Sequence, residues 1–247
     1  MSLHLPKLDA DPEAPFPPVE TALRRPDGLL AFGGDLSVPR LRNAYRHGAF
    51  PWFSDGQPIL WWSPEPRTVF DTTRLRPNRR LARSLRSSTW TLRADTAFAE
   101  VVAACAQAPR RGQDGTWITA DMQDAYVALH EAGDAHSVEV FDGRRLVGGI
   151  YGVAIGRMFF GESMFSGETG GSKAALLGLA ARMRAWDMPL IDAQVENPHL
   201  SSLGAVHWPR ARFIEAVQAL VARTPPVTGR WDEAFGERAV ADLGTGR

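Results

Sequence analysis

Three consecutive segments between residues 136 and 166 have the pattern of β-strands separated by glycine-bearing turns. They read HSVEVFDG, RRLVGGIYGVAIG and RMFFGESMFS, and the pair Asp142-Gly143 is typical of a tight hairpin turn. Strands that follow one another through short turns pair in antiparallel order. This part of the chain therefore requires an antiparallel sheet, and the remaining segments must cover its faces.

Helical patterns surround this sheet segment. GSKAALLGLAARMRAW repeats apolar residues three and four positions apart from about Ser172, and PLIDAQVEN then forms a short apolar strand. Other helices are predicted over 77–86, 96–108 and 120–133 and in PRARFIEAVQALVA, with a strand in TWTLRAD. We expect NPHLSSLGAVHWP to be a loop and the Pro- and Gly-rich tail to be loose. Helices, then strands, then a βαβ unit favour an α+β domain of the acyltransferase type.

The first 65 residues differ from the rest, because they are rich in proline, glycine and tryptophan. One helix is predicted there, with Ser37 as its N-cap and Pro39 in its first turn. We expect a small N-terminal domain over residues 1–65 and a larger domain over residues 66–247.

Composition excludes several classes of protein. The chain has 247 residues, 44% hydrophobic and 23% charged, which is ordinary for a globular protein and excludes disorder, collagen and coiled coil. The lone Cys105 cannot form an intramolecular disulfide, which fits a reducing cytoplasm. No signal-peptide pattern and no apolar run of about 18 residues is present, so we expect a cytoplasmic protein, and we take it to be a monomer. The histidines lack metal-ligand spacing and no phosphate-binding glycine motif is complete, so no metal or cofactor is predicted.

Positive charge is concentrated in one segment, although 28 basic residues balance 28 acidic ones overall. No acidic residue occurs between Arg74 and Arg93, and arginine is well shaped for phosphate contact. A solvated arginine face would have the same pattern as a surface that follows an RNA backbone. The arginines at helical spacing, our candidates for contact with RNA phosphates, are Arg79, Arg80, Arg83 and Arg86.

Two carboxylates and an amide are candidates for catalysis. Asp192 and Gln194 lie two positions apart in a predicted strand, so their side chains would share one face. An acid beside an amide can accept a proton and orient a carbonyl, although a structural aspartate has the same signature. Glu162 follows an apolar strand, so the sheet can bring it close to Asp192.

Apolar residues surround these candidates. Some recur at helical spacing after Ser172, and others flank Glu162 or lie one strand back. Such residues form either ordinary core or an adaptable pocket for an apolar side chain, and the pattern does not separate the two. The set comprises Ile150, Phe159, Met164, Leu176, Leu179 and Met183.

Tryptophans occur where the pattern predicts loops rather than regular elements. They include Trp52, the pair Trp61-Trp62 and Trp117. Connections run over the surface, so loop tryptophans are candidates for stacking on a base or sugar. Together with the arginines, they favour contact with RNA.

Several segments together resemble the leucyl/phenylalanyl-tRNA–protein transferases. The segments are DGLLAFGGDLS, YRHGAFPWFSDGQPILWWSPEPR, GTWIT, AHSVEV, LVGGIYGV, FFGESMFS, SKAALL, LIDAQVEN and SLGA. The resemblance implies a small N-terminal domain and a GNAT-like acyltransferase domain. It also implies an enzyme that moves Leu, Phe or Met from aminoacyl-tRNA to the N-terminal Arg or Lys of a protein and so marks it for degradation.

The resemblance also implies roles for the residues above. By similarity, Asp192 and Gln194 match the catalytic strand motif, and Glu162 matches the carboxylate that meets the acceptor amine. Trp52 and Trp117 match the aromatic pair at the terminal adenosine of the tRNA, and the six apolar residues match the pocket for the donor side chain. An aminoacyl ester is already activated, so only a neutral amine held against its carbonyl is required.

Two other functions stay open. An acyltransferase that uses acyl-CoA would need a pyrophosphate-binding turn, which GETGGSK fits poorly. In that same segment two glycines stand where the similar proteins often carry larger residues. An RNA-binding module without catalysis gives no reason for carboxylates beside an apolar pocket.

Overall fold

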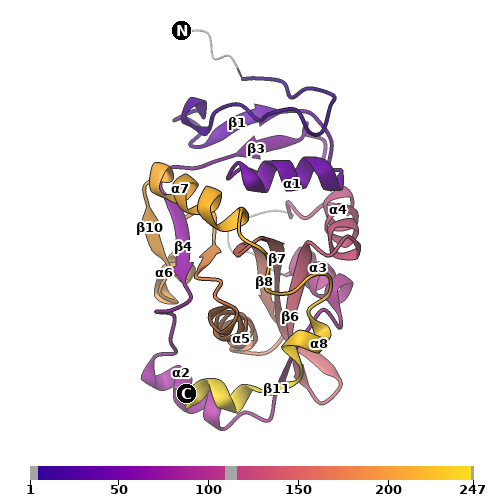
Figure 1. Ribbon diagram of the computed structural model, residues 1–247. Helices are drawn as coiled ribbons and strands as arrows, with labels where there is room; N and C mark the ends of the chain where they lie inside the picture. The colour runs from indigo at the N-terminus through magenta and orange to yellow at the C-terminus, as the bar shows by residue number, and fades with distance from the viewer. Residues whose placement is uncertain (1–4, 109–115, 246–247) are drawn as a thin grey trace.

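The computed structural model of the chain describes residues 5–108 and 116–245 (Figure 1). Its largest element is an eight-stranded sheet, and the strands of this sheet are β4 (Arg67–Asp71), β5 (Thr91–Ala94), β6 (Ala135–Asp142), β7 (Arg145–Ile155), β8 (Met158–Ser166), β9 (Leu190–Asp192), β10 (Val206–Trp208) and β11 (Arg238–Ala239). They lie in the order β10-β4-β9-β8-β7-β6-β5-β11, and every neighbouring pair is antiparallel except β8 and β9. The predicted α+β class, with a small N-terminal part and a large mixed sheet, is confirmed.

The centre of the sheet follows the sequence pattern closely. β6, β7 and β8 form two successive hairpins, as predicted, and Gly143 adopts a φ of 61° in the first turn. Helix α5 (Gly171–Ala185) then crosses over and returns the chain as β9, parallel to β8. A parallel neighbour requires such a crossover, which explains the long apolar helix between two strands.

Helices cover both faces of this sheet. α5 packs against β6, β7 and β8 on one face. α3 (Phe98–Gln107) packs against the same three strands on the other face, and α4 (Ala120–Glu131) packs against α3 and β6. Two glycines of β7 permit α5 and α3 to lie close to the sheet. A Cβ on Gly148 would lie 2.4 Å from the backbone of Gly171 in α5, and one on Gly149 would lie 3.0 Å from Val101 in α3. Alternation along the strand therefore assigns one glycine to each helical layer.

The N-terminal residues form a second, three-stranded sheet ordered β1-β3-β2, composed of β1 (Leu29–Phe32), β2 (Phe50–Pro51) and β3 (Leu60–Trp62). Helix α1 (Val38–Arg46) begins as predicted, because the Ser37 hydroxyl accepts a hydrogen bond from the amide of Arg40 at 3.4 Å. The pair Trp61-Trp62 lies on β3 and not in a loop, and Trp61 is fully buried. The loop prediction for this pair is therefore wrong.

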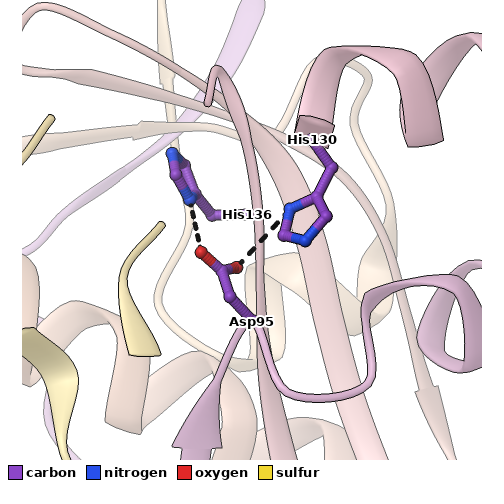
Figure 2. A group of neighbouring side chains, drawn as sticks. All are labelled: Asp95, His130 and His136. Atoms are coloured by element: carbon purple, nitrogen blue, oxygen red, sulfur yellow. Dashed lines mark hydrogen bonds and ion pairs between the residues drawn. The ribbon is translucent and has the colours of Figure 1, made fainter. Parts of the chain in front are cut away.

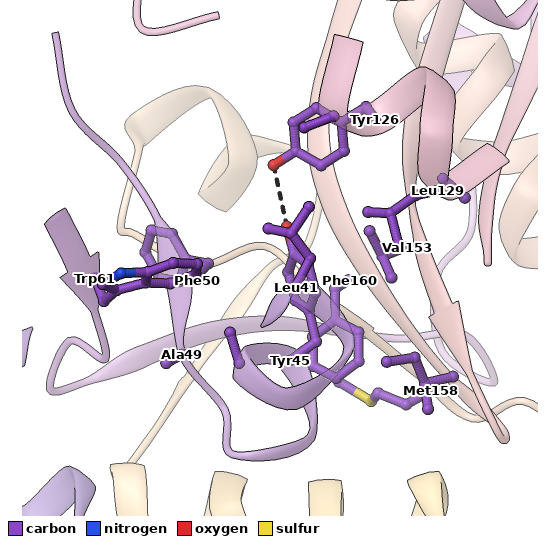
Figure 3. Packing of buried hydrophobic residues seen from close by; sticks show 14 of the residues in the cluster. Leu41, Tyr45, Ala49, Phe50, Trp61, Tyr126, Leu129, Val153, Met158 and Phe160 are labelled. Atoms are coloured by element: carbon purple, nitrogen blue, oxygen red, sulfur yellow. Dashed lines mark hydrogen bonds between the residues drawn. The ribbon is translucent and has the colours of Figure 1, made fainter. Parts of the chain in front are cut away.

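The N-terminal part and the large sheet share a hydrophobic core (Figure 3). Leu41 and Tyr45 of α1 and Trp61 of β3 belong to the same buried cluster as Tyr126 of α4 and Phe160 of β8. Helix α7 (Arg210–Val221) also contributes to this cluster. The division of the chain at residue 65 stays a prediction, since the buried surface is continuous across it.

Two C-terminal predictions are wrong. The expected loop 197–209 contains the short helix α6 (Pro198–Ser202) and the edge strand β10. The tail is held in place through α8 (Asp232–Phe235), β11 and the 3₁₀ helix η2 (Val240–Gly244), whose apolar residues are buried in the second core cluster. Helix α2 (Arg79–Arg86) packs on η2. Within the described ranges no helix is long and apolar enough to cross a membrane.

Candidate active site

A small recess opens where the N-terminal part meets the large sheet. Its volume is about 110 Å³, and its lining comprises Phe50, Pro51, Trp52, Trp117, Glu162, Gln194 and Val195. These residues come from β2, the loop after it, the segment before α4, the strand β8 and the segment after β9. The fold thus brings together four of the predicted site residues: Glu162, Gln194, Trp52 and Trp117.

The carboxyl group of Glu162 is held by three side chains. Tyr45 of α1 donates a hydrogen bond to Oε1 at 2.8 Å, and Tyr126 of α4 donates to Oε2 at 2.5 Å. The side-chain amide of Gln194 donates to Oε1 at 2.9 Å. Both tyrosines are fully buried, whereas Glu162 keeps 9% of its surface exposed toward the recess. The carboxyl group is therefore fixed in place and open on one side.

Burial raises the pKa of Glu162 to about 7. The hydrogen bonds from Tyr126, Tyr45 and Gln194 act in the opposite direction, and the nearby charge of Asp192 adds to the rise. The two tyrosine hydroxyls also lie 3.0 Å apart (Figure 3). When Glu162 is protonated, its O–H can donate to one tyrosine and that tyrosine to the other, so this network satisfies both protonation states.

The predicted alignment of Asp192 with Gln194 on one strand face is wrong. β9 ends at Asp192, and Gln194 adopts a φ of 61°, in the left-handed region. The backbone turns there because the amide of Gln194 donates to Asp192 Oδ1 at 2.9 Å, and the amide of Thr68 donates to the carbonyl of Gln194 at 3.1 Å. This turn, and not strand alternation, directs Gln194 to Glu162.

Asp192 is fully buried and belongs to an ion pair that sequence reasoning missed. Arg67 of β4 donates to Asp192 from Nε at 2.8 Å and from a terminal nitrogen at 2.7 Å. The same guanidinium lies over the rings of Phe50 and Phe213 and donates to the carbonyl of Gly48. We predict that Asp192 takes up the proton or charge of the attacking amine, directly or through Gln194. The ion pair disfavours the direct route, because Arg67 already balances the charge of Asp192, and this role stays a prediction.

The two tryptophans predicted to stack on a base flank the recess. Trp52 and Trp117 also line a neighbouring groove of about 770 Å³, so the recess continues into an aromatic surface. Trp62 supports this arrangement, since its indole N–H donates to the carbonyl of Trp52 at 2.6 Å and its ring centroid lies 5.5 Å from that of Trp52.

The six candidate residues for a donor pocket lie together in the second core cluster. Met164 is partly buried against this cluster, and the other five are buried, with exposures from 0% to 5%. Half of them come from α5, and the others come from β7 and from β8, the strand that also carries Glu162. The six residues are Ile150, Phe159, Met164, Leu176, Leu179 and Met183.

The candidate phosphate-binding arginines lie on α2, at the end of the large sheet opposite the N-terminal part (Figure 1). Arg79, Arg80, Arg83 and Arg86 are exposed. Arg86 also donates to the carbonyl of Gly244 at 2.9 Å, which attaches α2 to η2. The helix begins two residues later than predicted, with Asn78 as its N-cap.

A second cluster of titratable residues lies away from the recess (Figure 2). Asp95, His130 and His136 come from the end of β5, from α4 and from β6, so their sequence spacing gave no indication of this grouping. Asp95 contacts His136 at 2.8 Å and accepts hydrogen bonds from the amides of Ser137 and Trp231. These bonds occupy the carboxylate oxygens, and His136 stacks on Trp231 at 3.9 Å. The cluster attaches the C-terminal segment to the sheet.

Sequence reasoning also missed Tyr45 and Tyr126. The chain has only three tyrosines, and each lies within an apolar pattern that marks core. A buried tyrosine usually needs a partner for its hydroxyl, so this scarcity was a signal that could have been used. Nothing in the sequence connects Arg67 to Asp192, because 125 positions separate them.

Comparisons with known proteins identify the family of this chain. The profile of the family described as leucyl/phenylalanyl-tRNA protein transferase matches residues 69–218, and that of its N-terminal domain matches residues 34–65. A leucyl/phenylalanyl-tRNA–protein transferase of Xanthomonas axonopodis pv. citri (strain 306) is 65% identical over 248 aligned residues, which cover 100% of this chain and 99% of the relative. One from Xylella fastidiosa (strain M23) is 61% identical over 96% of this chain and 97% of the relative.

Among solved structures, L-PGS from Bacillus licheniformis matches 64% of this chain and 65% of its own length, with a TM-score of 0.40 and 9% identity. The sequence matches, in contrast, extend over both parts of the fold and include the residues of the recess. This chain belongs to the leucyl/phenylalanyl-tRNA–protein transferase family.

Proposed function

We propose that this chain transfers leucine, phenylalanine or methionine from aminoacyl-tRNA to the N-terminal Arg or Lys of acceptor proteins, which marks them for N-degron-dependent degradation. Family membership over the whole chain supports this activity. Its partners are then a charged tRNA and a protein with a basic N-terminus.

The observation that carries the proposal is the carboxyl group of Glu162, held by two tyrosines at the floor of a recess between two tryptophans. A carboxyl group with a pKa of about 7 is poised to exchange a proton near neutral pH. Its charge also complements an acceptor that carries a basic side chain.

The proposed reaction needs one positioned base. The acceptor's α-amino group, whose ordinary pKa is near 8, attacks the ester carbonyl of the aminoacyl-tRNA. The new C–N bond forms, the amine gives its proton to Glu162, and the C–O bond to the terminal ribose breaks. Glu162 then gives this proton to the ribose oxygen, which leaves as a hydroxyl, and the carboxylate of Glu162 is restored. The ester is already activated, so holding the amine against the carbonyl supplies most of the acceleration.

Gln194 orients the amine in this proposal, and Asp192 acts as a positioning residue. Since the amide nitrogen of Gln194 donates to Glu162, its amide oxygen points away from that carboxyl group and can accept an N–H of the acceptor. Asp192 holds the backbone of Gln194 in its left-handed turn. Asp192 thus acts through Gln194 without contact with the substrate.

The remaining roles concern the donor. We assign the terminal adenosine of the tRNA to Trp52 and Trp117, and the acceptor stem to the exposed arginines of α2. The apolar cluster on α5 would receive the donor side chain once Met164 and its neighbours open, and methionine is suited to such adaptation. We place the enzyme in the cytoplasm, where charged tRNA is available, and assign the small N-terminal domain to residues 1–65.

A direct assay tests the activity. The protein is incubated with charged tRNA and an Arg-initiated peptide, without ATP or coenzyme A. Transfer of the labelled amino acid to the peptide is expected, and a matched peptide with an N-terminal Glu should receive little. Transfer only when acyl-CoA is added would instead support an ordinary acyltransferase. Binding of tRNA without transfer would support an RNA-binding module.

A further inference from the structure

A second cavity lies outside the catalytic recess and has a different character. Its volume is about 440 Å³, and it lies between α5, the segment before α2, and the C-terminal elements α8, β11 and η2. It shares no lining residue with the recess at Glu162. Buried apolar residues form part of its wall: Leu75, Leu92, Leu177 and Phe235.

Four arginines line this cavity: Arg76, Arg182, Arg184 and Arg238. Within the described ranges none of them lies within 4.0 Å of a carboxylate oxygen, unlike the arginines of the ion pairs elsewhere in the fold. Arg76, Arg184 and Arg238 each donate only to a backbone carbonyl. The cavity is therefore positively charged, and the exposed Asp242 is the one acidic residue in its lining.

Arg182 has a hydrogen-bond donor without an acceptor. Its Nε is buried and has no hydrogen-bond partner, while its guanidinium lies 4.8 Å from the ring of Trp186 and 6.0 Å from that of Phe235. Burial and the nearby Arg238 lower the pKa of Arg182, and burial and Arg76 do the same for Arg184. An anion bound between these guanidinium groups would offset their repulsion.

We propose that this cavity binds a small phosphorylated ligand with several negative charges and an apolar portion, of the nucleoside polyphosphate class. The lining leaves three positive charges uncompensated, which matches the charge of a di- or triphosphate. Its volume lies within the range of small-molecule sites, and its apolar wall suits a base. An RNA backbone fits the site less well, because the exposed arginines of α2 offer it an open surface.

Calorimetric titration of the full chain tests the proposal, with GTP and inorganic pyrophosphate as separate probes. Saturable binding of one GTP per chain is expected, with weaker binding of pyrophosphate, which lacks a base. The double variant Arg182→Gln/Arg238→Gln should bind GTP roughly ten- to a hundredfold more weakly, because charged acceptors lose their partners. Arg144→Gln removes an exposed arginine outside the cavity and should leave GTP binding unchanged. Trp117→Ala should also leave GTP binding unchanged, because Trp117 lies at the proposed adenosine site and not in this cavity. GTP bound at the adenosine site would instead be lost in this variant.

Melting of the ligand-free variants separates binding from structure. Since the cavity arginines repel one another, Arg182→Gln/Arg238→Gln should melt at or above the wild-type temperature. If it unfolds, Arg76→Gln, at an exposed position, serves as the second variant. Three outcomes would overturn the proposal: no saturable GTP binding at millimolar concentration, wild-type GTP affinity in the cavity variants, or weaker tRNA binding in those variants without GTP binding. The last would assign the cavity to RNA.

Discussion

Glu162 and Asp95 are both buried carboxyl groups, but their surroundings push their pKa values in opposite directions. Glu162 accepts hydrogen bonds from two neutral hydroxyls and a side-chain amide, and burial raises its pKa to about 7. Asp95 is also buried, but His136 and the amides of Trp231 and Ser137 outweigh burial and lower its pKa. The donors around a buried acid thus decide whether it can exchange a proton at neutral pH or stays ionised and structural.

A third carboxyl group sharpens this comparison. Burial also raises the pKa of Glu139 to about 7, although Thr96 and Ser137 donate to it. Glu139 has no exposed surface and lines none of the cavities described above. A raised pKa alone therefore does not single out a candidate base, and access from the recess distinguishes Glu162 from Glu139.

The largest effect is expected from Glu162→Gln, which keeps the shape and removes the base. It should lower kcat by about two to four orders of magnitude, the usual contribution of a positioned acid or base. In the wild type, kcat/KM should rise with pH through about 7, because Glu162 becomes ionised there. Rapid-quench transfer assays across about pH 5.5–9 measure kcat of the variant and the pH dependence of kcat/KM. Glu139→Gln is the matched control and should retain wild-type kcat. Equal losses in both variants would mean that access from the recess does not distinguish Glu162 from Glu139.

Next in size is the effect of Asp192→Asn on stability. This change leaves Arg67 buried without its counter-charge, and it should reduce the free energy of unfolding by about 3–5 kcal/mol. Denaturant titration measures the loss. The surviving folded protein should still react in a single turnover, at a rate reduced through misplacement of Gln194. A stable Asp192→Asn variant with no transfer would restore Asp192 as the proton acceptor.

A smaller stability change is expected from Asp95→Asn. Removing this carboxylate should cost about 1–3 kcal/mol at pH 7, since charged hydrogen bonds to His136 and to backbone amides are lost. The pKa of Asp95 is lowered in the folded state, so its contribution is present above the ordinary aspartate pKa of about 4 and disappears as pH falls further. Melting curves of both proteins should therefore converge in acid. Transfer activity at 25 °C should be unchanged, and a large loss would connect this cluster to catalysis.

The smallest effect concerns the tuning of Glu162 by its neighbours. The hydrogen bond from Tyr126 lowers the pKa of Glu162 against the effect of burial. In Tyr126→Phe, the pH at which kcat/KM rises should be higher by up to about one pH unit, the equivalent of one hydrogen bond. Tyr45→Phe should shift it in the same direction. A downward shift in either variant would mean that the tyrosines stabilise the protonated form.

Local chemistry along the chain was sufficient to predict much of the fold. Ser37 caps α1, Asp142-Gly143 closes the β6–β7 hairpin, and the apolar spacing after Ser172 marks α5. Each of these features depends on residues within a few positions of one another. Family-specific segments likewise placed Glu162, Gln194 and the two tryptophans in one site, and the recess contains all four.

The tertiary structure alone determined how these residues work together. Gln194 leaves the strand because Asp192 and Thr68 hold its backbone in a turn, and strand periodicity could not indicate this. The charge of Asp192 depends on Arg67, 125 positions away, and the pKa of Glu162 depends on hydroxyls from α1 and α4. Sequence patterns report which residue types recur along the chain. Desolvation and partner identity arise only when distant segments pack together, and these two factors decide which buried acid carries the proton.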